Sequence, residues 1–270
     1  MTNLLAVDFK RVLKDKLFFV VCILAAVFAV ITPLLYALLL GGMEEMLGTM
    51  GLSMSAKSQF FDSFSLGNNL GLIAPVLLAI ILCKDFGQGT VRNKLIGGNT
   101  RNSIVLSMFT VAFVVLFGVM LLHALLTFGL ALIFFPYSDG AAFSLSELGY
   151  FLASLGLEFV LYLVLAALVV WLCVVMKNVG LVIVAYIAIV MGMTIVTSLL
   201  QLGGMVLEEA TVKTLIEAVQ SINVFNFALV IGKGSTYALK DLLCCILTPL
   251  VGAGALMGWS LLKFRRKDLK

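Results

Sequence analysis

The sequence predicts an all-α membrane protein that crosses the bilayer six times, with both termini in the cytoplasm. Of the 270 residues, 62% are hydrophobic and 12% are charged, and the mean hydropathy is +1.17. Soluble domains carry roughly 25% charged residues. The apolar residues form long runs, and the basic residues gather on one side of them. Composition, run length and charge placement therefore indicate the same class of protein.

Six apolar runs are long enough to span a membrane as helices. Spanning about 30 Å of hydrocarbon takes roughly 20 helical residues, and a helix satisfies its own backbone hydrogen bonds in lipid. The runs lack the alternating apolar and polar pattern of barrel strands. The predicted spans are residues 17–40, 66–83, 104–135, 148–176, 179–201 and 242–262. We expect residues 1–270 to form a single transmembrane domain.

The positions of lysine and arginine predict the orientation, because cytoplasmic loops retain these residues. Fourteen of the eighteen basic residues precede the first span, follow the sixth, or lie between spans two and three or spans four and five. The opposite side holds most of the acidic residues. Both termini are therefore placed in the cytoplasm. The net charge of +4 reflects this sidedness, and no nucleic-acid partner is expected.

Residues 1–16, ahead of the first span, are predicted to form an amphipathic helix in the cytoplasmic headgroup region. One helical arc carries the apolar side chains Leu5, Phe9, Val12 and Leu13. The other arc carries the charged side chains Asp8, Lys10, Arg11, Lys14 and Asp15. This division is typical of a helix that lies in the membrane interface. The alternative is that these residues only anchor the orientation of the first span.

Residues 202–241 form the longest segment between spans and are predicted to lie outside the cell. Apolar residues at helical spacing between positions 207 and 222 predict an amphipathic helix. The stretch VFNFALVIG that follows is apolar but too short to cross the bilayer. We therefore expect one or two short helices on the outer membrane face.

Residues 84–103 interrupt the apolar chain between spans two and three, and they predict a short helix that is bounded at both ends. Two glycines before it permit a turn, and Thr90 is expected to cap the helix VRNKLI by accepting hydrogen bonds from its free amides. Two glycines after it end the helix. Asn99 or Thr100 is then expected to cap the third span.

The short helix also carries an apolar ridge. Val91 and Leu95 are four residues apart, so they fall on one helical face. Arg92, Asn93 and Lys94 flank them. We expect this helix to lie at the cytoplasmic surface and to present the ridge with a positively charged rim.

Several residues of this segment follow one pattern, which is an acid four residues before Gly-Thr, then a basic residue, a leucine and a final Thr-Arg. They are Asp85, Gly89, Thr90, Arg92, Leu95, Thr100 and Arg101. Together with six spans and an N-terminal interfacial helix, this pattern resembles the ABC-2 type permeases, the membrane subunits of ATP-binding-cassette exporters. The short, glycine-rich version looks most like permeases that export peptides or confer resistance to antimicrobial peptides.

The resemblance implies a transport subunit and not an enzyme. The sequence contains no G-x-x-x-x-G-K-[ST] phosphate loop, so ATP and Mg²⁺ are expected on a separate ABC ATPase, present in two copies. No cofactor is expected on this chain itself. A second copy of the permease, or a similar one, would complete the pathway for the substrate. The location implied is the cytoplasmic membrane of a bacterium, with the lipid bilayer as a further partner.

The resemblance also implies which residues couple the permease to the ATPase. The short helix would sit in a groove of the ATPase and act as a lever on spans two and three, and the N-terminal helix would make a second contact. The expected coupling residues are Asp85, Gly89, Thr90, Val91, Arg92, Lys94, Leu95, Arg101, Phe9 and Arg11.

His123 in the third span and Glu158 in the fourth are predicted to lie at similar depths in the membrane. Ionisable residues inside a membrane are costly, and they face a partner or a wet cavity. One hypothesis is that the two side chains pair, as a structural contact or a proton-sensitive gate. The other is that Glu158 reaches water or forms a hydrogen bond alone. No metal site is expected, because the five cysteines lack the spacing of metal ligands.

Other functions stay open on the sequence alone. Ion or small-drug efflux would use the same architecture, although the spans contain few charges. An intramembrane enzyme would need a set of catalytic groups at membrane depth, for which one histidine and one deep glutamate are poor material. A non-transporting membrane anchor or sensor is the remaining alternative.

Overall fold

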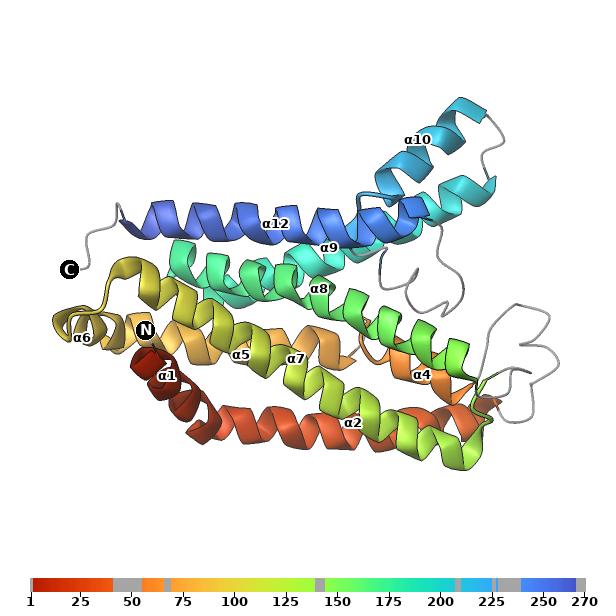
Figure 1. Cartoon of the computed structure of the whole chain (residues 1–270), viewed down its shortest axis with the longest axis horizontal. Helices are drawn as coiled ribbons and strands as arrows, with labels where there is room; N and C mark the ends of the chain where they lie inside the picture. Colours follow the sequence, from red (N-terminus) through yellow and green to blue (C-terminus); the bar gives the residue numbers. More distant parts are fainter. Residues whose placement is uncertain are drawn as a thin grey trace.

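All regular secondary structure that the computed structural model describes is helical. The described residues are 2–40, 55–65, 69–138, 144–206, 210–224, 227 and 239–265. They contain ten helices, and the long ones run side by side as a bundle (Figure 1). The predicted fold class, an all-α protein, is confirmed.

Six of the helices are long and apolar enough to cross a membrane, as predicted. They are α2 (Lys16–Leu40), α5 (Asn69–Gly87), α7 (Arg101–Phe134), α8 (Leu145–Met176), α9 (Val179–Val206) and α12 (Leu239–Arg265). The protein is therefore a multi-pass membrane protein. The N-terminus, the short helix α6 (Thr90–Ile96) and the last turn of α12 lie at the same end of the bundle (Figure 1). Which side of the membrane this end faces stays a prediction.

Three of the spans form the centre of the bundle and three lie at its periphery. More than half of the apolar window of α5, α7 and α8 is buried, whereas most of that of α2, α9 and α12 is not. α8 packs against α12, and α7 packs against α2. The peripheral helices expose apolar side chains, which is what lipid requires of the outer surface of a bundle.

Before the first span, α1 (Thr2–Lys14) confirms the predicted N-terminal helix. Its inward face differs from the predicted apolar arc. Leu4, Asp8 and Val12, at i, i+4 and i+8, are buried against the bundle, whereas Val7 and Leu13 are exposed. Asp8 was expected on the outward, charged arc, and that expectation is wrong because Asp8 has partners inside the protein.

A short helix that the sequence analysis did not predict, α4 (Ala56–Asp62), lies in the half of the bundle away from α6 (Figure 1). Ser55 caps it by accepting a hydrogen bond from the Ser58 N–H at 3.2 Å. The Phe60 ring lies 4.7 Å from that of Phe151 and 5.9 Å from that of Phe128, centroid to centroid. An aromatic cluster on α7 and α8 therefore holds α4 in place.

Within the predicted external segment, α10 (Ala210–Gln220) confirms one amphipathic helix. It lies at the end of the bundle opposite α6 (Figure 1). The start of the predicted helix, residues 207–209, and most of the apolar stretch that follows it lie outside the described residues.

Candidate functional site

The short helix α6 ends at Ile96 as predicted but begins one residue earlier, at Thr90, and one of its predicted caps is wrong. Gly89 precedes the helix in the left-handed conformation, with φ of 69°, and no side chain caps the amides. Thr90 is already the first helical residue and therefore cannot act as the cap. At the other end the Gly97 N–H donates to the Asn93 carbonyl at 3.0 Å, and Gly98 adopts φ of 84°. Glycine tolerates these positive φ values, so this chemistry fixes where α6 begins and ends.

The cap of the third span is Thr100, one of the two predicted residues. Its hydroxyl oxygen accepts a hydrogen bond from the Ser103 N–H at 3.2 Å. The other candidate, Asn99, instead donates from its side-chain amide to the Lys94 carbonyl at 2.9 Å. Asn99 therefore supports the end of α6, while Thr100 begins α7.

The apolar ridge of α6 faces the protein and not the surface. Val91 is only 3% exposed, and Leu95 is half-buried against the same core. The prediction that Val91 is presented to a partner is therefore wrong, since its burial anchors α6 to the bundle. For Leu95 it stays a prediction, because this side chain is only partly buried. The outward face of α6 consists of Arg92, Asn93 and Ile96, and Ile96 is 75% exposed.

Asp85, at the end of α5, lies between two cations from different helices. Its carboxylate forms an ion pair with Arg11 of α1, and it contacts Lys94 Nζ of α6 at 3.0 Å. Only 1% of the Asp85 side chain is exposed. Asp85, Arg11 and Lys94, all predicted as coupling residues, are therefore brought together, and their contacts are made within the chain.

Asp8 of α1 extends this arrangement to a fourth helix, α7, through Ser107. Lys94 Nζ lies 2.7 Å from Asp8 Oδ1, and the Ser107 hydroxyl of α7 donates to Asp8 Oδ2 at 2.7 Å. We call these five residues, Asp8, Arg11, Asp85, Lys94 and Ser107, the basal cluster. Asp8 and Ser107 were not among the predicted site residues. The signal for Asp8 was its i, i+4 spacing between Leu4 and Val12, two apolar residues that are both buried.

Burial changes the protonation behaviour of the cations in the basal cluster. It lowers the pKa of Arg11, although the charges of Asp8 and Asp15 oppose this effect. Burial also lowers the pKa of Lys94, and the hydrogen bond to Asp8 partly offsets it. A buried ion pair costs desolvation energy, and losing one partner leaves the other charge uncompensated. The basal cluster therefore holds α1, α5, α6 and α7 in one arrangement.

Another ion pair, outside the basal cluster, joins α5 to the turn between α1 and α2. Lys84 Nζ lies 2.8 Å from Asp15 Oδ2, and the Leu17 N–H donates to Asp15 Oδ1 at 3.0 Å. Partial burial raises the pKa of Asp15, but these two hydrogen bonds and the charges of Lys84 and Arg11 outweigh it, so the pKa lies below its usual range. Phe9, another predicted coupling residue, is half-buried and packs beside Val12.

Arg101, at the start of α7, binds the end of α12. Its Nη1 donates to the carbonyls of Phe264 and Arg265 at 3.1 and 2.8 Å. Arg265 Nε donates in return to the Asn102 side-chain oxygen at 3.0 Å. The last carbonyls of a helix have no partner within that helix. Arg101, predicted to contact an ATPase, therefore satisfies these groups and fixes the last span.

His123 and Glu158 do not form the hypothesised pair. The Nδ1 atom of His123 lies 3.0 Å from the Ala25 carbonyl oxygen, so His123 joins α7 to α2. Glu158 is completely buried, and neither of its carboxyl oxygens has a hydrogen-bond partner among the described residues.

The basal cluster joins side chains from α1, α5, α6 and α7. The described residues contain no group of three or more histidine, cysteine or acidic side chains that could hold a metal ion. Of the predicted coupling cations, Arg11, Lys94 and Arg101 make contacts within the protein, whereas Arg92 is exposed. No protein-family model matches the chain, and no curated protein is significantly similar to it in sequence.

Proposed function

We propose that this chain is the membrane-spanning permease subunit of an ABC exporter of the ABC-2 type, which moves an amphipathic or hydrophobic substrate, such as a peptide, out of a bacterial cell. ATP and Mg²⁺ would bind to a separate ATPase. The observation that carries the proposal is α6, a helix bounded by glycines between the second and third spans and bound to the basal cluster.

The contacts of α6 support its role in coupling. Val91 is buried in the bundle, and Lys94 joins α6 to the carboxylates of Asp8 and Asp85. A displacement of α6 would therefore move α1 and the end of α5 with it, because the ion pairs and the packing resist separation. α6 also lies directly ahead of α7, so the third span is joined to it by a short connection.

The outward face of α6 supports an intermolecular contact. Ile96 is a large apolar side chain that is 75% exposed, next to the exposed Arg92 and Asn93. An apolar side chain with a neighbouring cation and amide provides the burial and the polar contacts that protein interfaces combine. In this proposal, closure of two ATPase subunits on ATP pushes α6, and two permeases open a path between them.

Co-expression with an ABC ATPase encoded beside this chain tests the proposal. We expect the two proteins to co-purify and the ATP hydrolysis of the complex to be suppressed when Ile96 is replaced by Glu, because the charge would be buried in the contact. The matched control is Ile133→Glu. Ile133 is another exposed isoleucine, and it lies near the end of α7 that is farther from α6. If no such ATPase associates with the chain, or if both variants behave alike, the proposal is wrong.

A further inference from the structure

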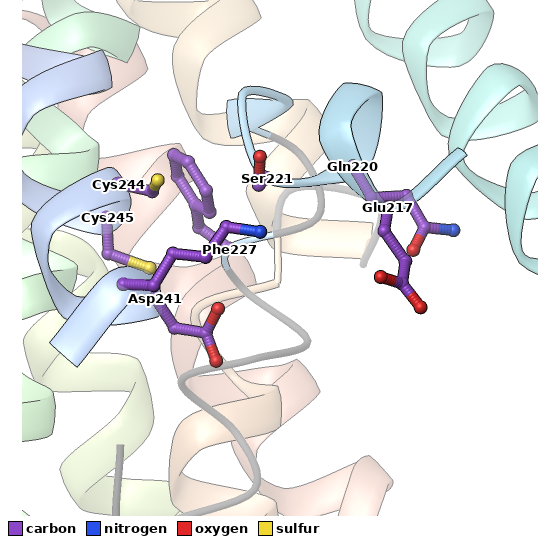
Figure 2. A pocket seen from close by; sticks show the side chains of 8 residues that line it. Glu217, Gln220, Ser221, Phe227, Asp241, Cys244 and Cys245 are labelled. Atoms are coloured by element: carbon purple, nitrogen blue, oxygen red, sulfur yellow. The ribbon is translucent and has the colours of Figure 1, made fainter. Parts of the chain in front are cut away.

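A pocket lies between α10 and the start of α12, at the end of the bundle opposite α6. Its volume is about 210 Å³. The residues that line it are Glu217, Gln220, Ser221, Phe227, Lys240, Asp241, Cys244 and Cys245 (Figure 2). A drug-sized molecule needs roughly 300 Å³ or more, so this pocket fits a small chemical group or part of a larger molecule.

The lining combines a negatively charged rim with an apolar floor. Glu217 of α10 and Asp241 of α12 are exposed carboxylates, and Lys240 is the one cation among the lining residues that the structure describes. Phe227 and Cys245 are each 2% exposed and form the floor. The excess of negative charge favours a cation, and an aromatic ring adds attraction for an ammonium group.

We infer that this pocket binds an ammonium group carried by a small apolar body. The carboxylates of Asp241 and Glu217 balance the positive charge, while the apolar part lies on Phe227 and Cys245. The inference goes beyond the proposed function, because binding at this pocket does not require an ATPase. It holds or fails in the isolated chain.

Labelling of Cys244 tests this inference in the purified full-length protein. Cys244 lines the pocket and is half-buried, whereas Cys22 of α2 has similar exposure and lies outside the pocket. We expect benzyltrimethylammonium to slow the reaction of Cys244 with N-ethylmaleimide and to leave the labelling of Cys22 unchanged. Benzyl alcohol, a neutral aromatic probe, should protect neither cysteine. Each rate is compared with that of the same variant without a probe.

Substitution of the rim residues distinguishes charge recognition from simple occupancy. The half-protecting concentration is the benzyltrimethylammonium concentration that halves the rate of Cys244 labelling. Asp241→Asn and Glu217→Gln should each raise it about fivefold, and Lys240→Gln should lower it. Lys213→Gln, on α10 but outside the pocket, should change it less than about twofold. Equal protection by benzyl alcohol, or full protection in an Asp241→Asn, Glu217→Gln double variant that elutes normally and labels Cys22 normally, would overturn the inference.

Discussion

Asp85 and Lys94, nine residues apart, form an ion pair across the turn that joins α5 to α6, with the carboxylate and Lys94 Nζ 3.0 Å apart. Arg11 from α1 binds the same carboxylate. Because Asp85 is almost completely buried, the contact is shielded from water and salt. The second span, α6 and the N-terminal helix are therefore fixed to one another at a single residue.

Replacing Asp85 by Asn should strongly destabilise this end of the bundle. Arg11 and Lys94 would lose the charge between them, and breaking a buried ion pair costs about 3–5 kcal/mol. Thermal unfolding of the purified protein measures the loss. The conservative variant Asp85→Glu should recover part of it. Unchanged unfolding of Asp85→Asn would show that the ion pairs do not hold α1 and α6.

Replacing Asp15 by Asn should have a much smaller effect, because the Asp15–Lys84 pair is more exposed. An exposed ion pair contributes about 0–1 kcal/mol. Asp15 is therefore the matched control for Asp85, with the same change of side chain in an ion pair at the same end of the bundle. Equal destabilisation by the two substitutions would contradict the ranking by burial.

The Asp15 pair should also be sensitive to acid. The pKa of Asp15 is lowered in the folded protein, so its contribution is present above the pKa of the unfolded chain, about 3.9. It is lost as the pH falls through the folded pKa. The free energy of unfolding of the wild-type protein should therefore lose its small excess over that of Asp15→Asn between about pH 5 and the folded pKa of Asp15. Denaturation midpoints across this range measure it, and an advantage that grew on acidification would reverse the predicted sign.

Replacing Arg101 by Ala should loosen the end of α12. Two carbonyls of α12 would lose their donor, at a cost of about 1 kcal/mol or more. Arg101→Lys should recover only part of this stability, because lysine cannot reproduce the planar geometry of the guanidinium. Proteolysis of the C-terminal end of α12, followed over time, measures the loosening. Protection equal to wild type in Arg101→Ala would contradict this role.

His123 and Glu158 should be energetically independent. His123 bonds to the Ala25 carbonyl, and Glu158 has no hydrogen-bond partner in the part of the chain described by the structure. A double-mutant cycle with His123→Leu and Glu158→Gln should give a coupling energy below about 0.5 kcal/mol. The single His123→Leu change should lower stability, because the buried Ala25 carbonyl loses its contact. A coupling above about 1 kcal/mol would restore the hypothesis of a pair.

The sequence was sufficient to predict the six spans, since hydrophobic length and charge placement are properties of single segments. It also predicted the extent of α6 to within one residue, because glycines fix local backbone geometry. It did not predict the direction that α6 faces. Val91 and Leu95 form a ridge whether they pack inward or outward, and only tertiary contacts decide between these arrangements.

The basal cluster was only partly predictable for a related reason. Asp85, Arg11 and Lys94 stood out as charged residues near membrane spans, but the contact of Arg11 with Asp85 joins positions far apart in the sequence. Asp8 seemed to belong to a solvated helix face, because charged side chains usually do. Its burial depends on Ser107 and Lys94, which approach it only in the folded bundle.

Site-specific cross-linking measures the proposed contact of α6 with an ATPase. In a background without native cysteines, single cysteines replace Ile96, which is exposed, or Val91, which is buried on the opposite face. We expect Ile96→Cys to form a cross-link to the co-purified ATPase with a thiol-reactive linker and Val91→Cys to form none. A cross-link from Val91→Cys with none from Ile96→Cys would contradict the proposed contact. So would the absence of a cross-link from both Ile96→Cys and Arg92→Cys, a further single-cysteine variant at an exposed position of α6.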